Sequence, residues 1–148
     1  MASDRFLTLA DVADVLNISA SQTYALVRNG ELDGWRPDER ELVAQVARYY
    51  RRAMPKPGHL DYAALTPADR RRVDVLAALL RVADGLDSRH QGLVTDVACR
   101  AEGGRIVISA QADGEVSGEL AAATEKADVF ERAFGMPAAF EAVDGVRA

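Results

Sequence analysis

The stretch "LLRVADGLDSRHQGLVTDVACRA", Leu79 to Ala101, changes its hydrophobic periodicity near His90. Before that residue the apolar positions recur at the spacing of an amphipathic helix, and after it they alternate or run β-branched, as strands do. The chain therefore passes here from a helical half into a half that contains a sheet. This change predicts an α+β fold.

Two helices are expected between Pro37 and this point. Thr66 can cap a helix that has Pro67 at its first position and Asp69 three residues after the cap, and this helix is predicted to run to about Leu86. Its predicted apolar face consists of Val73, Leu76, Ala77, Leu80 and Ala83. An earlier helix is predicted from Pro37 in "PDERELVAQVARYYRRAM", with Leu42, Val43, Val46, Ala47 and Tyr50 on one face.

Downstream, the chain is predicted to form a small strand-strand-helix-strand unit. "LVTDVACRA" and "RIVISAQA" read as strands joined by a hairpin turn at "EGG". A helix is expected from about Ser117, with Leu120, Ala123, Ala127, Phe130 and Phe134 on one face and Gly135 just past its end. "PAAFEAV" can return as a third strand. Cys99, the single cysteine, is expected to be a small, buried residue of the first strand.

Composition describes a folded chain that does not enter a membrane. The 148 residues carry a net charge of -5, and 49% of them are hydrophobic. No apolar run approaches the roughly 20 residues that span a bilayer, and the start "MASDRFLTLADV" lacks the pattern of a signal peptide. A cytoplasmic protein is expected.

The charge is unevenly distributed along the chain. Residues 1–36 hold three basic and five acidic residues, whereas residues 48–72 hold seven basic and two acidic ones. A polyanion would therefore be attracted chiefly to the middle of the sequence. The basic residues considered as a phosphate-binding set are Arg48, Arg51, Arg52, Arg70, Arg71 and Arg72. Two interpretations of these arginines are open. They form either a solvated surface or a groove in which their guanidinium groups pair with phosphate oxygens.

The N-terminal segment reads as two short helices. Thr8 can cap the first, Ser19 or Ser21 the second, and Gly30 can end the second. Residues 6–32, "FLTLADVADVLNISASQTYALVRNGEL", resemble the excisionase-type, MerR-like helix-turn-helix family of bacterial regulators. The residues carried over to the groove-facing side of the second helix are Ala20, Ser21, Gln22, Tyr24, Ala25 and Arg28.

This resemblance implies DNA as a partner. Gln22 can pair with adenine, Arg28 with guanine or phosphate, and Ser21 and Tyr24 with phosphate oxygens. Only "DGWRP" stands where such domains continue into a wing, so Trp35 is either the remnant of the wing or a packed aromatic residue of a linker. The alternative role of the motif is that of a packing or dimerising unit.

Residues 39–142 resemble the C-terminal region of the exopolyphosphatase and guanosine pentaphosphate phosphatase family. The resemblance rests on the block "ELVAQVARYYRRAMPKPGHLDYAALTPADRRRVDVLAALLRVADGLDSRHQG" and the later "EKADVFERAFG". It implies HD-like helices followed by a small α/β unit, and it does not extend to the actin-like domains that carry the family's active site. The expected division is therefore a helix-turn-helix segment at 1–36, an HD-like part at 37–92 and an α/β unit at 93–148.

The Ala-Asp pair at Asp84 matches the last ligand of an HD metal site. Such a site also needs a histidine and an adjacent His-Asp pair, but His59 and His90 are the only histidines and neither precedes an aspartate. We therefore expect Asp84 or Asp87 to make structural hydrogen bonds, and we expect no catalytic residues, metal or cofactor.

Two functions from different classes are compatible with these patterns. The first is a DNA-binding regulatory protein whose C-terminal part is a non-catalytic sensing or dimerisation domain, with a homodimer as its expected form. The second is an accessory module that binds polyphosphate or a guanosine nucleotide and does not bind DNA. A phosphatase ranks last, because function belongs to sites rather than to folds.

Overall fold

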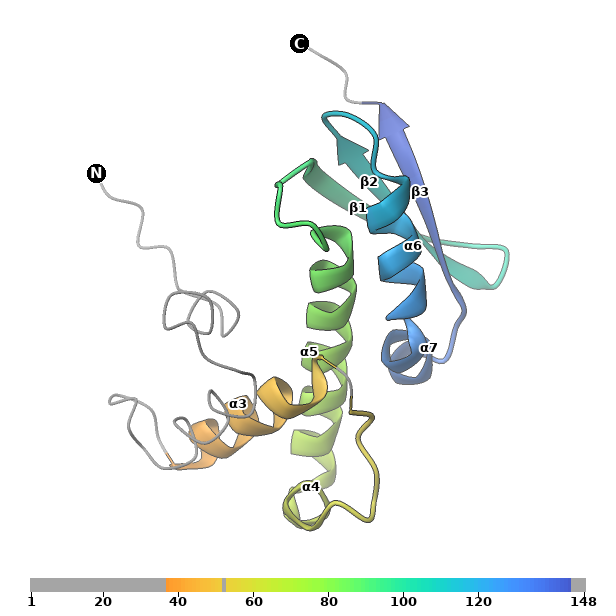
Figure 1. The fold of residues 1–148 in the computed structure, drawn as a ribbon. Coiled ribbons are helices and arrows are strands. Elements are labelled where there is room, and N and C mark those ends of the chain that lie inside the picture. Colours follow the sequence, from red (N-terminus) through yellow and green to blue (C-terminus); the bar gives the residue numbers. More distant parts are fainter. Residues whose placement is uncertain (1–36, 52, 145–148) are drawn as a thin grey trace, which may run out of the picture. The chain divides into compact units, whose positions relative to one another are not determined.

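The computed structural model describes residues 37–51 and 53–144, and it divides the chain into two compact parts, residues 1–73 and 74–148 (Figure 1). The helix-turn-helix expected at residues 6–32 lies outside the described residues. The boundary at Val73 falls inside a helix, so each part is described by itself. Among the described residues, no helix combines the length and apolar character that a membrane span requires.

The part up to Val73 contains helix α3 (Pro37–Tyr49), the short helix α4 (Leu60–Ala64) and the start of α5 (Pro67–Leu86). Its organising side chain is Tyr49, which is fully buried. The Tyr49 hydroxyl is 2.7 Å from Nδ1 of His59, the two rings stack, and Tyr62 packs edge-on against Tyr49. An aromatic residue outside the predicted apolar face of α3 thus centres this packing.

The start of α5 confirms the predicted cap. The Asp69 backbone N–H donates to Thr66 Oγ1 at 3.1 Å, and the Thr66 hydroxyl donates to the Asp69 carboxylate at 2.7 Å. This reciprocal pair satisfies a backbone donor that the first turn would otherwise leave without a partner. The helix then continues to Leu86, as predicted from the sequence.

The predicted apolar face of α5 is only partly correct. Val73 and Ala77 are fully buried, but Leu76 is 49% exposed. The second half of the helix instead buries a set that includes a charged residue, namely Ala78, Arg81, Val82 and Leu86. A hydrophobic pattern could not indicate this face, because the side chain at its centre is an arginine.

The strands form one three-stranded sheet in the order β1-β2-β3. Strands β1 (Val94–Glu102) and β2 (Arg105–Ala112) pair antiparallel, and β3 (Ala138–Asp144) pairs parallel to β2. Gly103 and Gly104 have φ values of 57° and 75°, which is the left-handed geometry of a two-residue hairpin turn. The predicted hairpin and third strand are confirmed.

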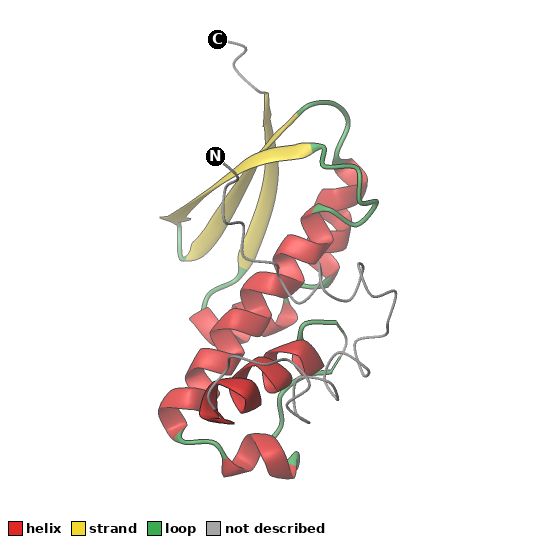
Figure 2. Ribbon diagram, turned by 90° about the vertical axis from the view of Figure 1, so that its left-hand side faces the viewer, coloured by secondary structure: helices red, strands yellow, loops and turns green. Residues whose placement is uncertain are grey.

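The single helix predicted after Ser117 is two helices, α6 (Ser117–Glu125) and α7 (Asp128–Phe134). Two residues of α5 bind Lys126 at the break between α6 and α7. Arg81 Nε donates to the Lys126 carbonyl at 3.4 Å, and the Asp84 carboxylate binds the Lys126 ammonium group. Gly135 ends α7 with a φ of 68°, as predicted. Figure 2 shows these helices together on one side of the sheet.

Helices α5 and α6 approach each other closely at Gly85. A Cβ atom built on Gly85 would lie 2.5 Å from the Cα of Ala123 and 2.7 Å from its backbone nitrogen. No side-chain rotation relieves a contact with backbone atoms. The absence of a side chain at this position therefore allows the two helices to meet.

Gly85→Ala is expected to lower the free energy of unfolding by about 1 to 3 kcal/mol, because α5 and α6 must separate to admit the methyl group. Gly118→Ala is the matched control on α6, where the added Cβ would lie 4.0 Å from Arg89 Cζ. Gly118 is an exposed residue in the first turn of α6, so that change should leave the free energy of unfolding within about 0.5 kcal/mol of wild type. Urea unfolding of both variants measures the difference, and equal stability for Gly85→Ala and wild type would contradict the close approach.

Candidate functional site

The polar residues at the end of α5 occupy structural positions. The Asp84 carboxylate binds the ammonium group of Lys126, and the Asp87 carboxylate accepts a hydrogen bond from the Gly92 backbone N–H at 3.1 Å. His90 is exposed, with Nδ1 3.8 Å from Asp87. These contacts confirm the expected structural hydrogen bonds of Asp84 and Asp87.

Of the two histidines, His90 is the one that lies near these aspartates, 3.8 Å from Asp87. His59 lies in the other compact part, where its ring contacts Tyr49. Within residues 37–51 and 53–144, no three His, Cys, Asp or Glu side chains are grouped in a way that could hold a metal ion. The Asp84 carboxylate has an ammonium group as its neighbour, which is the opposite of a cation site that needs a converging set of anionic ligands.

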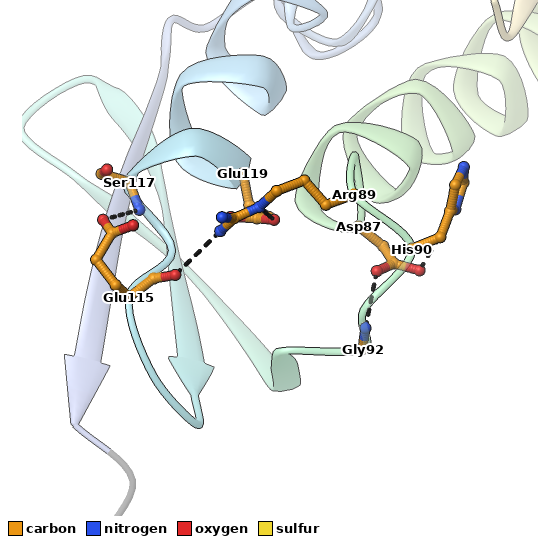
Figure 3. A network of polar contacts seen from close by, with 7 residues as sticks. All are labelled: Asp87, Arg89, His90, Gly92, Glu115, Ser117 and Glu119. Atoms are coloured by element: carbon orange, nitrogen blue, oxygen red, sulfur yellow. Dashed lines mark hydrogen bonds and ion pairs between the residues drawn. The ribbon is translucent and has the colours of Figure 1, made fainter.

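An arginine-carboxylate pair joins the loop after α5 to the start of α6, as Figure 3 shows. Arg89 donates through Nε and Nη2 to the two carboxylate oxygens of Glu119, each at 2.6 Å. The Glu119 residue is 1% exposed, and the hydrogen bonds from Arg89 lower the pKa of its carboxyl group. Sequence reasoning missed this pair, because neither residue stands in a recognisable motif.

The beginning of α6 is held by the same network. Arg89 Nη2 also donates to the Glu115 carbonyl at 3.1 Å, and the Glu115 carboxylate accepts from the Ser117 backbone N–H at 2.7 Å. Hydrogen bonding with Ser117 lowers the pKa of Glu115. The network fixes two loops to each other and has the character of a structural clamp.

An apolar groove opens beside this clamp, wholly within residues 74–144. It has a volume of about 340 Å³. Its lining comes from α5, from the sheet and from α7, and consists of Leu79, Val82, Ala83, Leu86, Asp87, Val94, Val97, Cys99, Ile108 and Phe130. With one carboxylate among ten lining residues, the groove suits apolar contact better than phosphate chemistry.

Cys99 corrects a prediction from the sequence. It lies on a strand, as predicted, but it is exposed rather than buried. The reason is its position on β1, an edge strand of which eight of nine residues are exposed. Edge position depends on strand order, which the local sequence does not specify.

Of the six arginines considered for phosphate binding, two form ion pairs with different acids. Arg48 lies 4.0 Å from Asp61, and Arg72 binds Asp69 at 2.9 Å, so different acids hold them. Arg51 and Arg71 are exposed and Arg70 is half-buried, while Arg52 lies outside the described residues. The DNA-contacting candidates also lie outside the described residues: Ser21, Gln22, Tyr24 and Arg28.

In the Glu119→Gln variant, the free energy of unfolding is expected to decrease less at acid pH than it does in the wild type. Because the folded-state pKa of Glu119 is lowered, its contribution is fully present above the unfolded-chain value of about 4.3 and is lost as the pH falls through the lower folded value. Urea unfolding between about pH 3 and 6 measures this dependence. Glu125→Gln is the control, because it removes an exposed carboxylate from the same helix. Its free energy of unfolding should depend on pH as that of the wild type does. If Glu119→Gln left the pH dependence of the free energy of unfolding unchanged, the ionised Glu119 carboxylate would not stabilise the fold.

Comparison with known proteins adds no relative to this picture. No family model matches the chain, and the search of curated proteins gives no match.

Proposed function

We propose that the chain is a cytoplasmic DNA-binding regulatory protein whose C-terminal part is a non-catalytic sensing or dimerisation domain. The observation that carries the proposal is the resemblance of the sequence of residues 6–32 to excisionase-type helix-turn-helix domains, which implies that Gln22 and Arg28 face the groove. In that geometry the second helix enters the major groove, where these two side chain types read base edges.

The contacts of Asp84 support the non-catalytic half of the proposal. Its carboxylate is bound by Lys126, so a metal ion would have to displace an ammonium group before it gained even one ligand. The neighbouring Asp87 already accepts a backbone hydrogen bond from Gly92. A carboxylate that joins α5 to the junction between α6 and α7 in this way serves packing and orientation rather than hydrolysis.

An accessory module that binds polyphosphate or a guanosine nucleotide is the second candidate. The observation in its favour is the exposure of Arg51 and Arg71 in the basic region of residues 48–72. Thermal-shift measurements with polyphosphate and with guanosine tetraphosphate separate the two candidates. A rise in unfolding temperature that Arg71→Ala abolishes, without any DNA binding, would favour this second function.

The DNA contact is expected to depend on the second helix of the motif. Arg28→Ala should weaken binding and reduce its salt dependence, and Gln22→Ala should change the discrimination at one base pair by about 1 to 3 kcal/mol. Gel-shift titrations of the full chain against genomic and random fragments, from low to physiological salt, measure both effects.

Arg71→Ala is the control for that experiment, because it removes the same charge from the basic middle of the chain. It should leave sequence preference unchanged. If Arg71→Ala abolished binding and Arg28→Ala did not change it, the DNA contact would lie outside the motif. The absence of any gel shift at low salt would reject DNA binding.

The purified protein is expected to contain no stoichiometric metal and to release no phosphate from polyphosphate or guanosine pentaphosphate. Asp84 and His90 would at best offer two ligands, which bind a divalent ion loosely. Elemental analysis and phosphate assays with added magnesium or manganese measure this. About one equivalent of metal, with phosphate release that Asp84→Ala abolishes, would overturn the prediction.

A further inference from the structure

Strand β1 presents a long open edge. It is the first strand in the sheet order β1-β2-β3, so among the described residues no strand pairs with its outer side. Eight of its nine residues are exposed, and it extends over Val94–Glu102. An exposed edge strand of this length offers a row of backbone donors and acceptors to another strand.

The hairpin turn determines which residues of β1 point outward. The two-residue turn at Gly103 and Gly104 makes Glu102 and Arg105 a hydrogen-bonded pair, and hydrogen-bonded and open positions alternate along an antiparallel ladder. The backbone groups of Val97, Cys99 and Ala101 therefore point to the open edge. In agreement, the Val97 N–H donates to the Asp96 side chain at 2.9 Å instead of to β2.

Two of these three residues, Val97 and Cys99, also expose their side chains toward the groove. Val97 is 43% exposed and Cys99 is exposed, and both line the groove together with Leu79 of α5, which is 46% exposed. Open backbone groups and apolar surface thus coincide on one strand. A partner that contacted only the apolar side chains would leave the open N–H and C=O groups of β1 without protein partners. A strand can pair with these groups and cover the apolar surface, so we expect the partner to be a strand.

We propose that β1 pairs antiparallel with β1 of a second copy of this chain, about a two-fold axis at Ala98. In this register Val97 stands opposite Cys99 of the second copy, which joins the two grooves into one apolar surface. Asp96 then stands opposite Arg100 of the second copy, so opposite charges meet twice across the axis.

Charge pairing selects this axis over its neighbours. Two residues that stand opposite each other across the strands must have their side chains on the same face of the sheet. The two-fold axis must therefore pass through a residue and not between two residues. An axis at Cys99 would place Asp96 opposite Glu102, two like charges. An axis at Val97 would place Asp96 opposite Ala98, which leaves the aspartate without a charged partner.

The groups needed for the pairing are available. Arg100 uses Nε for Glu102 and Nη1 for Ser109 and Glu141, which leaves Nη2 for the incoming carboxylate. When the Val97 N–H donates to the Cys99 carbonyl of the second copy, Asp96 is released to reach that arginine. Each copy then contributes the same two outward residues, Val97 and Cys99, to the backbone hydrogen bonds.

The inference rests on the proposed function in one respect, since it names the surface through which the dimerisation domain would pair two DNA-reading segments. Its test measures mass in the absence of DNA. A monomer that still binds DNA would overturn this inference alone, and a dimer that binds no DNA would overturn the proposed function alone.

Sedimentation of the full chain is the first measurement. From a subunit of 16.0 kDa, a dimer of about 32 kDa is expected to form with rising concentration between roughly 1 and 100 µM. Val97→Lys should weaken the dimer by about tenfold or more, because a charged side chain on an edge strand opposes strand pairing. Val143→Lys is the matched control on the other edge strand, since Val143 is 42% exposed, and should leave the mass unchanged.

Circular dichroism and thermal unfolding establish that both lysine variants are folded. A dimer that Val143→Lys disrupts and Val97→Lys does not would place the interface on β3 and overturn the proposal. A chain that stays at 16.0 kDa throughout, whether β1 is bare or covered by another segment of the chain, would also overturn it.

Oxidative cross-linking tests the register. In a Cys99→Ser background, Ala98→Cys should form an intermolecular disulfide, because residues at the axis have Cα atoms about 4.5 Å apart. Ala101→Cys should not link, since its two copies would lie about 20 Å apart along the strands. Efficient linking by Ala101→Cys and none by Ala98→Cys would overturn the assigned axis.

Discussion

The close approach of α5 and α6 at Gly85 is the constraint on which the C-terminal part depends. Because no side chain separates Gly85 from the Ala123 backbone, the α5 residues one turn away come within reach of the α6–α7 junction. Arg81, 5% exposed, donates to Asp128 at 2.7 Å and to the Lys126 carbonyl. A buried guanidinium is tolerated only when such partners are supplied, and the junction between α6 and α7 supplies them to Arg81.

This arrangement also explains the apolar groove. With the Arg81 and Gly85 side of α5 against α6, the leucines at Leu76 and Leu79 are left exposed. Leu79 borders the groove, whose other wall is the outermost strand. An exposed apolar surface bounded by an open edge strand is uncommon in a chain that stays monomeric, since both features promote association.

The elements that the sequence predicts well are those decided by local chemistry. Thr66 with Asp69 defines a helix start, and Gly103 with Gly104 defines a hairpin, because each feature needs only neighbouring residues. The face of α5, the break at Lys126 and the exposure of Cys99 depend on contacts between residues far apart in sequence, or on strand order. Of the candidate site residues, Asp84 could be assigned a structural role from its incomplete ligand set, but its partner Lys126 could not be named.

Pairing of two chains would strengthen the proposed binding to DNA. Residues 1–36 carry more acidic than basic residues, so a single motif gains little from phosphate neutralisation. Two motifs joined through their C-terminal parts would bind as a unit, because the second contact becomes intramolecular once the first has formed. A two-fold axis between the copies also matches the symmetry of paired half-sites on DNA. The proposed pairing through β1 would therefore compensate for the low positive charge of the proposed DNA-reading segment.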